Sequence, residues 1–197
     1  TVTGEVSNTT DIGYVFQSPG TQLVRQTVER DVVFGLENRG LPPEDIEDRI
    51  ARYADRLDAR ELLDREVTTL SSGETAKAAI LGILVTEPDV LILDEPLAPL
   101  DYPNTQLLLE ALDQLRDRGT ALVIAEHDLR DLLGRADRIH LLESGTVTAA
   151  GQPRDILRPL VESGVKLPFH LEVELARTDR GAMDEVSLTP GPEGDRA

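Results

Sequence analysis

Two consecutive carboxylates, Asp94 and Glu95, follow an apolar run in the segment LILDEP, residues 91–96. Phosphoryl transfer to water needs a metal held near the phosphates and a group that orients or deprotonates the attacking water. The first carboxylate could hold the metal, and the second could act as the base. Consecutive carboxylates at the end of a buried strand are costly unless they are used. An ordinary strand that leads into an acidic turn is the alternative for this hexapeptide taken alone.

Two more polar side chains follow apolar runs and could reach the same edge of a sheet. His127 follows ALVIAE, residues 121–126, and its neutral imidazole could hydrogen-bond a γ-phosphate or the attacking water. Gln17 ends DIGYVFQ, residues 11–17, and its amide could ligate Mg²⁺ or position water. In open parallel sheets, functional groups collect at the carboxyl ends of the strands. Taken alone, each of these two residues is more often structural.

The segment LSSGE, residues 70–74, stands just ahead of a predicted helix. Free N–H groups and the helix dipole favour a phosphate at a helix N-terminus, and Ser71 and Gly73 suit such a position. A serine that simply caps the start of the helix explains the same residues equally well. Both interpretations stay open on this segment alone.

The elements that would position these residues follow from the apolar pattern. A helix over residues 44–57 has one apolar face, which is made of Ile46, Ile50, Ala54 and Leu57. A second helix, apolar nearly all round, begins just after residues 71–73. Residues 90–94 and 121–125 predict two strands on either side of an amphipathic helix. Such a unit predicts strands that are parallel and buried.

The two ends of the chain predict different structures. Residues 1–17 predict two short strands, of which residues 11–17 are the second. Residues 138–143 and 146–150, joined across Ser144 and Gly145, predict a hairpin. Beyond residue 177 the chain becomes polar and rich in glycine and proline, which predicts a disordered tail.

The composition is strongly acidic, since 37 Asp and Glu residues against 20 Lys and Arg residues give a net charge of −17. Such a surface repels nucleic-acid phosphates. Concentrated salt screens the repulsion between carboxylates, so we expect a halophilic source; a genome biased toward Arg codons is the alternative. No apolar run approaches the roughly 20 residues that cross a bilayer. The sequence has no cysteine for a disulfide or a thiolate metal site.

In their order along the chain, Gln17, LSSGE, LILDEP, Asp101 and His127 resemble the motifs of the nucleotide-binding domain of the ABC ATPases. The resemblance implies an α/β fold, with a P-loop NTPase-like parallel sheet and an inserted helical subdomain. It also implies ATP and Mg²⁺ as cofactors. Gln17 would be the Q-loop glutamine, Asp94 the Walker B aspartate and metal ligand together with Gln17, and Glu95 the catalytic base. Asp101 would be the D-loop aspartate, and His127 the switch histidine.

The resemblance further implies that Ser71, Ser72, Gly73 and Glu74 form the signature loop, which contacts ATP held by a second ABC subunit in a head-to-tail dimer. Compared with the family pattern LSGGQ, Ser72 replaces the first glycine and Glu74 replaces the glutamine. Ser72 adds a side chain where backbone should approach phosphate. The sequence contains no G-x-x-x-x-G-K-[ST] loop. We therefore expect an N-terminally truncated domain that does not bind ATP tightly by itself.

Two further stretches narrow the class. Residues 27–35, TVERDVVFG, resemble the helix after the Q-loop in ATPases of the energy-coupling-factor and cobalt-transport type, and residues 165–176 resemble the C-terminal extension of that group. This implies an ATPase that powers import of a vitamin or a metal ion at the cytoplasmic face of the membrane. Its partners would be a second ABC ATPase subunit and a transmembrane subunit. The candidates for contact with that subunit, for which core packing is an equal explanation, are Phe16, Val24, Val28, Val32, Val33 and Phe34.

Three regions are predicted: a partial ABC ATPase domain at residues 1–153, a C-terminal extension at 154–176 and a disordered tail at 177–197. The helical subdomain is expected at about residues 20–88. A non-catalytic or degenerate ABC subunit is one alternative function, which Ser72 favours. A soluble ABC ATPase of DNA maintenance is a weaker alternative, because only a compact stretch separates Gln17 from Ser71 and the charge opposes DNA.

Overall fold

The computed structural model describes residues 10–171. These residues form two compact units, one that ends at Ala125 and one that begins at Glu126. Each unit is described by itself below. The first of the two strands predicted in residues 1–17 and the tail predicted at 177–197 lie outside the described residues.

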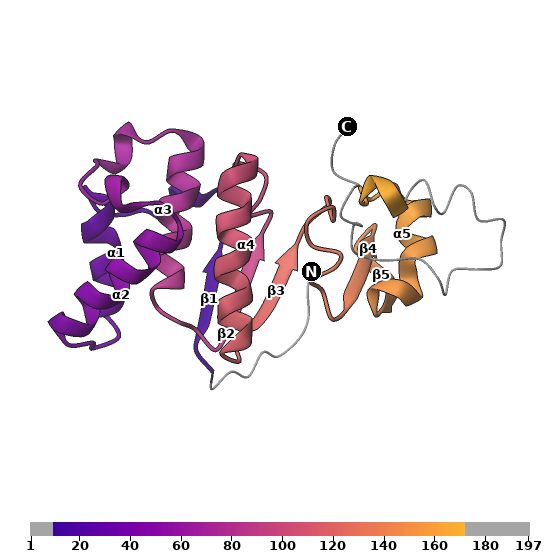
Figure 1. The fold of residues 1–197 in the computed structure, drawn as a ribbon, viewed down its shortest axis with the longest axis horizontal. Helices are drawn as coiled ribbons and strands as arrows, with labels where there is room; N and C mark the ends of the chain where they lie inside the picture. Colours follow the sequence, from indigo (N-terminus) through magenta and orange to yellow (C-terminus); the bar gives the residue numbers. More distant parts are fainter. Residues whose placement is uncertain (1–9, 172–197) are drawn as a thin grey trace. The chain divides into compact units, whose positions relative to one another are not determined.

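The first unit is built on a three-stranded parallel sheet. Its strands are β1 (Ile12–Val15), β2 (Val90–Asp94) and β3 (Ala121–Ala125), in the order β1-β2-β3. Val15 pairs with Leu93, and Leu93 pairs with Ile124. Helix α4 (Tyr102–Asp117) connects β2 to β3 (Figure 1). The predicted strand, helix, strand unit and its parallel sheet are confirmed.

Three helices lie between β1 and β2 in the sequence: α1 (Val28–Glu37), α2 (Pro43–Arg56) and α3 (Ser72–Leu84). The 3₁₀ turn η1 (Pro19–Thr21) precedes α1, and the turns η2 (Arg60–Leu62) and η3 (Val67–Thr69) lie between α2 and α3. Helix α2 begins with a proline in its first turn and carries acidic residues there, and both features favour a helix start. Its predicted apolar face is buried, as expected: Ile46, Ile50, Ala54 and Leu57 are at most 6% exposed.

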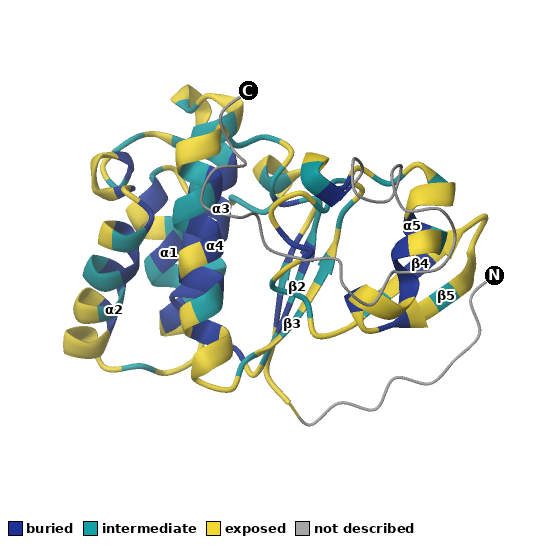
Figure 2. Cartoon of the chain, turned by 45° about the vertical axis from the view of Figure 1, so that its right-hand side comes forward, coloured by how far each residue is buried: buried dark blue, intermediate teal, exposed yellow. Residues whose placement is uncertain are grey.

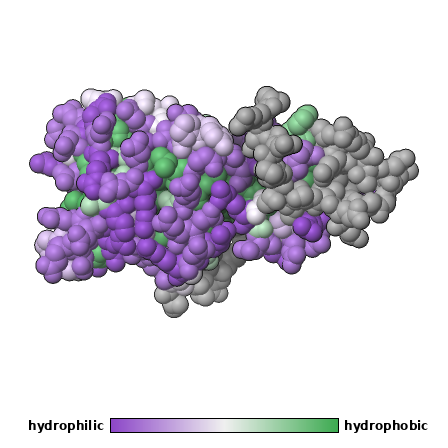
Figure 3. All heavy atoms as spheres, viewed as in Figure 1, coloured by the Kyte–Doolittle hydropathy of each residue, from purple (hydrophilic) through white to green (hydrophobic). Residues whose placement is uncertain are grey.

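The core of this unit lies between one face of the sheet and the helices (Figure 2). Leu91 and Leu93 are 0% exposed and belong to the same apolar cluster as the buried residues of α3 and α4. Gly13 allows α3 to approach β1 closely, because a Cβ atom there would lie 2.7 Å from Cγ2 of Ile83. The outer face seen in Figure 3 is mostly hydrophilic, as expected for an acidic chain.

Strand β3 is less buried than predicted. Its five residues alternate between exposed and partly buried, and Val123 is 54% exposed. Among the described residues, β3 is an edge strand, and the apolar cluster with α3 and α4 includes Leu122 and Ile124 but not Val123. The expectation that both strands are buried is therefore wrong for β3, because the predicted unit supplies a helix for only one face.

The second unit contains a hairpin and a short helical segment. Strands β4 (Ile139–Glu143) and β5 (Thr146–Gly151) pair antiparallel, which confirms the predicted hairpin. Its two-residue turn has positive φ at Ser144 (50°) and Gly145 (79°), as a type I′ turn requires. Turn η4 (Pro153–Ile156) and helix α5 (Leu157–Ser163) follow. Their apolar residues share one core with Leu133 and Leu141, so residues 154–171 of the predicted extension pack against the hairpin.

Among the described residues, none of the helices combines the length and the apolar character that crossing a membrane would require.

Candidate active site

The structure brings Gln17 and Glu95 into contact at the carboxyl ends of β1 and β2. Gln17 Nε2 donates a hydrogen bond to Glu95 Oε2 at 3.2 Å, across 78 residues of sequence. The parallel register pairs Val15 with Leu93, so strands β1 and β2 end at the same edge of the sheet. The backbone N–H of Glu95 donates to the carbonyl of Ala125 at 2.9 Å and thereby continues the bonding between β2 and β3. Glu95 is thus bonded through its side chain to Gln17, beyond the end of β1, and through its backbone to the end of β3.

The backbone of Glu95 is in the left-handed region, with φ of 48°. Residues other than glycine adopt this region at a cost of about 1–3 kcal/mol, and such residues cluster at functional sites. Pro96 follows and disfavours the right-handed helical conformation for the residue before it. The turn from β2 therefore begins immediately at Glu95, which directs the chain away from the sheet directly after Asp94.

The donor groups at this edge fit a magnesium ion. Asp94 is half-buried at the last position of β2, and its carboxylate and the amide oxygen of Gln17 are hard oxygen ligands. Magnesium in phosphate-transfer sites is held by one or two protein carboxylates, with the remaining ligands from water and phosphate. In the described part of the chain, no group of three or more His, Cys, Asp or Glu residues is placed to hold a metal, and a site of this kind needs no such group.

The side chain of Gln22 fixes the strand end that carries Gln17. Its Oε1 accepts from the N–H of Phe16 at 2.9 Å, and its Nε2 donates to the carbonyl of Tyr14 at 2.8 Å. The chain then packs on the first turn of α3, where a Cβ atom at Gly20 would lie 3.3 Å from Cγ2 of Thr75. Sequence reasoning did not find Gln22, because a glutamine in a turn carries no recognisable signal.

The predicted signature loop forms the start of α3. Ser71 is the N-cap: its hydroxyl accepts from the N–H of Glu74 at 3.3 Å, and the Glu74 carboxylate accepts from the N–H of Ser71 at 2.8 Å. This reciprocal pair is a capping box. Arg65 lies 3.3 Å from the Glu74 carboxylate. Ser71 therefore does cap the start of α3. The capping box also explains a glutamate at position 74 without any contact to a phosphate.

We expect Ser71→Ala to lower the free energy of unfolding by about 0.5–2 kcal/mol, because the N-cap acceptor is lost. Ser72→Ala is the matched control, since Ser72 is exposed and such surface changes stay within about 0.5 kcal/mol. Urea unfolding of both variants at one fixed KCl concentration measures the difference. Equal losses for the two serines would contradict the capping role.

The same box lowers the pKa of Glu74 below its ordinary value of 4.5, chiefly through the backbone N–H of Ser71, then through the Ser71 hydroxyl. A depressed folded-state pKa stabilises the fold above the unfolded-state pKa, and this contribution is lost as the pH falls through the folded-state value. We expect an NMR titration of the Glu74 carboxyl carbon to show a midpoint below 4.5. Ser71→Ala should raise that midpoint only part of the way, because the backbone donor remains. A midpoint at or above the ordinary value would refute the box in solution.

Gly73 and Ser72 differ in the space around them. A Cβ atom at Gly73 would lie 3.2 Å from the carbonyl oxygen of Pro99, so the start of α3 lies against the loop that leads to α4. Ser72 is exposed in the first turn of α3. A side chain at position 73 would therefore press on the carbonyl of Pro99, whereas position 72 has room for the serine that departs from the family pattern.

Asp101 is the N-cap of α4. Its Oδ1 accepts from the backbone N–H of Asn104 at 3.1 Å and from the Asn104 side-chain amide at 2.6 Å. An aspartate with this capping role favours a helix start whether or not it also serves a nucleotide. Its assignment as the D-loop aspartate remains a prediction.

His127 belongs to the second unit, two residues beyond the end of β3 in the sequence. Its Nδ1 lies 3.8 Å from Glu126 Oε2, and its carbonyl accepts from the N–H of Lys166 at 3.3 Å. Asp128 pairs with Arg130 at 2.6 Å, which is the main cause of a lowered pKa of Asp128. The role of His127 at the phosphate edge remains a prediction.

Comparison with known proteins identifies the family. The family profile described as ABC transporter matches residues 3–98. The chain is 43% identical over 160 residues to a Halobacterium salinarum protein described as an ABC transporter ATP-binding protein. This match covers 80% of this chain and 68% of that protein. The chain is also 38% identical over 183 residues to an energy-coupling factor transporter ATP-binding protein of Bacillus subtilis. This match covers 90% of this chain and 65% of that protein. The acidic composition fits the halophilic relative.

A solved structure agrees with these relatives. The structure of cbiO1 from Clostridium perfringens, described as part of the ABC transporter complex cbiONQ, is 34% identical with a TM-score of 0.64. The match covers 79% of this chain and 62% of that one. The chain thus spans about two thirds of the length of the proteins that it matches. The resemblance carried by the ordered motifs is confirmed, and the chain belongs to the ABC transporter ATP-binding proteins, a family of ATP-hydrolysing enzymes.

Proposed function

We propose that this chain provides the ATP-hydrolysing edge of an energy-coupling-factor type importer. The contact of Gln17 with Glu95 at the carboxyl edge of a parallel sheet is the observation that carries the proposal. It supplies a carboxylate base that is held by a neighbouring amide, at the position where open α/β sheets bind their ligands. Relatives named as energy-coupling factor transporter ATP-binding proteins support the same class.

In this proposal Glu95 accepts the proton of the water that attacks the γ-phosphate of ATP. The amide of Gln17 holds the carboxylate in place, so little reorganisation is needed when the proton moves. Asp94 and the amide oxygen of Gln17 would hold Mg²⁺, which when bound neutralises charge on the phosphate oxygens. His127 would donate a hydrogen bond to the γ-phosphate.

The start of α3 would face a second ABC subunit. Its N–H groups and dipole suit the phosphates of an ATP molecule that the other subunit holds. Ser71 can donate its hydroxyl proton to a phosphate while it accepts the N–H of Glu74. Gly73 keeps this loop against the loop at Pro99, so that movement of one loop is transmitted to the other.

Six apolar residues are candidates for contact with a transmembrane subunit, and only those that are exposed could make it. Phe16 is 51% exposed and Val24 is 67% exposed, whereas Val28 and Val32 are fully buried in the core. Val33 and Phe34 are partly buried. The proposed surface therefore rests on Phe16 and Val24, and it would lie at the cytoplasmic face of the membrane. A vitamin or a metal ion is the proposed solute.

A non-catalytic ABC subunit is the second candidate, and Ser72 is the observation that favours it. A side chain at the first turn of α3 adds bulk where backbone N–H groups would approach a phosphate. The subunit would then bind its partner and the membrane subunit without supporting turnover at the half-site that contains Ser72.

ATP hydrolysis by the complete gene product, assembled with its membrane subunit in concentrated KCl, tests the proposal. We expect magnesium-dependent hydrolysis that accelerates when the transported solute is present. ATP binding without hydrolysis, restored by Ser72→Gly, would favour the non-catalytic candidate. Absence of both activities in the assembled complex would refute the transport ATPase.

A further inference from the structure

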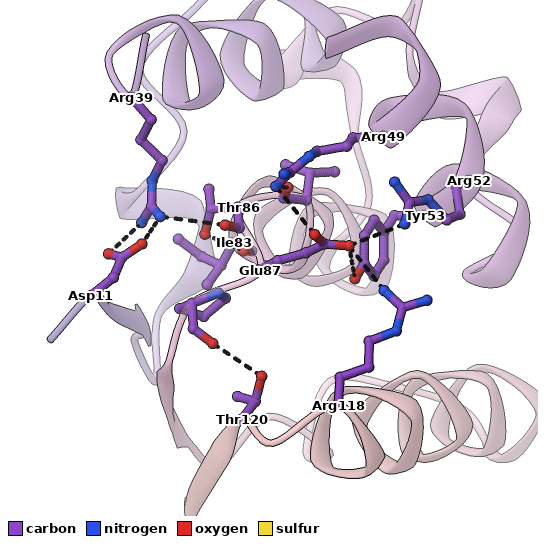
Figure 4. A network of polar contacts seen from close by, with 12 residues as sticks. Asp11, Arg39, Arg49, Arg52, Tyr53, Ile83, Thr86, Glu87, Arg118 and Thr120 are labelled. Atoms are coloured by element: carbon purple, nitrogen blue, oxygen red, sulfur yellow. Dashed lines mark hydrogen bonds and ion pairs between the residues drawn. The ribbon is translucent and has the colours of Figure 1, made fainter. Parts of the chain in front are cut away.

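Glu87 accepts contacts from four side chains at the edge of the first unit where the strands begin (Figure 4). Its Oε1 accepts from Tyr53 Oη at 3.0 Å, Arg118 Nη1 at 3.0 Å and Arg52 Nη1 at 3.2 Å. Arg49 Nη1 lies 3.3 Å from Oε2. Three of these side chains come from α2, and Arg118 immediately follows α4. These five residues, the Glu87 cluster, join elements that lie apart in the sequence.

Further hydrogen bonds hold the connection between α3 and β2, residues 85–89. Arg39, just beyond α1, pairs with Asp11 and donates to the carbonyl of Thr86 at 3.3 Å. Thr120, just ahead of β3, donates its hydroxyl to the carbonyl of Pro88 at 3.0 Å. In the described part of the first unit, strands β1 to β3 and helices α1 to α4 therefore meet this connection or an element bonded to it.

The Glu87 carboxylate offsets part of the positive charge that gathers in the Glu87 cluster. One carboxylate faces three guanidinium groups, and the Glu87 side chain is only 26% exposed. Tyr53 is fully buried, and burial followed by the Glu87 charge raises its pKa. Without the carboxylate, the two arginines of α2 and Arg118 would repel one another in a partly desolvated place. Glu87 thus holds α2 to the end of α4, because its pairs with these arginines offset that repulsion.

The backbone conformation of Glu87 is a second indication that its side chain has a specific role. Its φ is 48° and Pro88 follows, a combination that glycine would satisfy without strain. Glu95 and Pro96 repeat the same arrangement, with φ of 48°, at the other end of β2. A strained residue persists where its surroundings hold it, and at Glu87 the surroundings are the four bonded side chains.

We propose that Glu87 is a positioning residue that fixes the helical segment α2–α3 against α4 and the sheet, and so sets the place of the Ser71 loop relative to Glu95. Helix α3 ends at this connection and strand β2 begins at it, and at their opposite ends lie Ser71, at the start of α3, and Glu95, just beyond β2. With 13 residues, α3 is about 20 Å long at the helical rise per residue. A tilt of about 5° at Glu87 would move the far end of α3 by about 2 Å, which is enough to misplace the Ser71 loop relative to Glu95 and to slow the reaction.

The catalytic part of this inference rests on the proposed ATPase function, and the mechanical part does not. Two cysteines placed at exposed Glu47 on α2 and exposed Gln114 on α4 can carry spin labels, and these 197 residues contain no other cysteine that would be labelled. Pulsed electron paramagnetic resonance on the complete protein then measures the α2–α4 distance distribution. We expect Glu87→Gln to broaden that distribution. Turnover should fall about 2- to 30-fold, the usual size of such coupling effects, while the Kd for ATP stays within about twofold.

Arg118→Met removes one partner of Glu87. Because the Arg118 side chain is itself 46% exposed, this variant tests the cluster even where Glu87→Gln fails to fold. Arg116→Met is the matched control, since Arg116 pairs with Asp113 inside α4, and it should leave distribution and turnover unchanged. An unchanged distribution in Arg118→Met and Glu87→Gln overturns the proposal. A broadened distribution with unchanged turnover overturns the positioning role. If the unsubstituted protein does not hydrolyse ATP, the proposed function fails, and the distances alone decide whether Glu87 holds α2.

Discussion

Glu95→Gln is expected to lower ATP turnover by about 10²- to 10⁴-fold, the usual contribution of a general base. Glutamine has nearly the same shape as glutamate, and its carbonyl oxygen can still accept from Gln17 Nε2, which bonds Glu95 at 3.2 Å in the structure. The geometry of the edge is then kept, and only the ability to accept a proton is lost. ATP affinity should therefore stay within about twofold, because the base contributes to the transition state and not to the bound state.

Steady-state hydrolysis and nucleotide binding measured on the same preparation check this prediction, in a protein that contains a phosphate-binding loop. Glu110→Gln is a suitable control, because Glu110 is exposed on α4 and loses the same charge. Retained turnover in Glu95→Gln would place the base elsewhere. A parallel loss in Glu110→Gln would attribute the effect to net charge instead of to the site.

Leu93→Ala is expected to lower the free energy of unfolding by about 2–5 kcal/mol. Leu93 is 0% exposed and lies in the apolar cluster that joins the sheet to α3 and α4. Its truncation removes buried surface and leaves a cavity, because strands on both sides hold the backbone of β2 in place. The neighbouring residue is Asp94, so the variant also loosens the end of the strand that carries the carboxylates.

Val123→Ala is the matched control on the same sheet, because Val123 is 54% exposed. We expect a change within about 0.5 kcal/mol there. Chemical unfolding at constant KCl gives both values. A loss at Val123 as large as that at Leu93 would mean that the opposite face of the sheet is covered in solution, which would contradict the exposure seen for β3.

The sequence predicts elements well where a local pattern repeats. The helical spacing of Ile46, Ile50 and Ala54 is local, and so is the apolar run that ends at Asp94; both elements have the predicted place and type. The two-residue turn at Ser144 and Gly145 is equally local. The burial of β3 is not local, because it depends on what packs on each face of the sheet, and there the prediction was wrong.

The sequence by itself determined which residues could do the chemistry and which family the chain resembles, since motif order and residue type are properties of the chain. Only the tertiary structure decided that Gln17 bonds Glu95, and that Ser71 and Asp101 cap helices. It alone revealed Glu87, whose partners, from Arg118 to Arg49, are 31 to 38 residues away. The physical reason is that a side chain's partners depend on how the elements pack, and a lone glutamate before a proline has no periodicity that could indicate them.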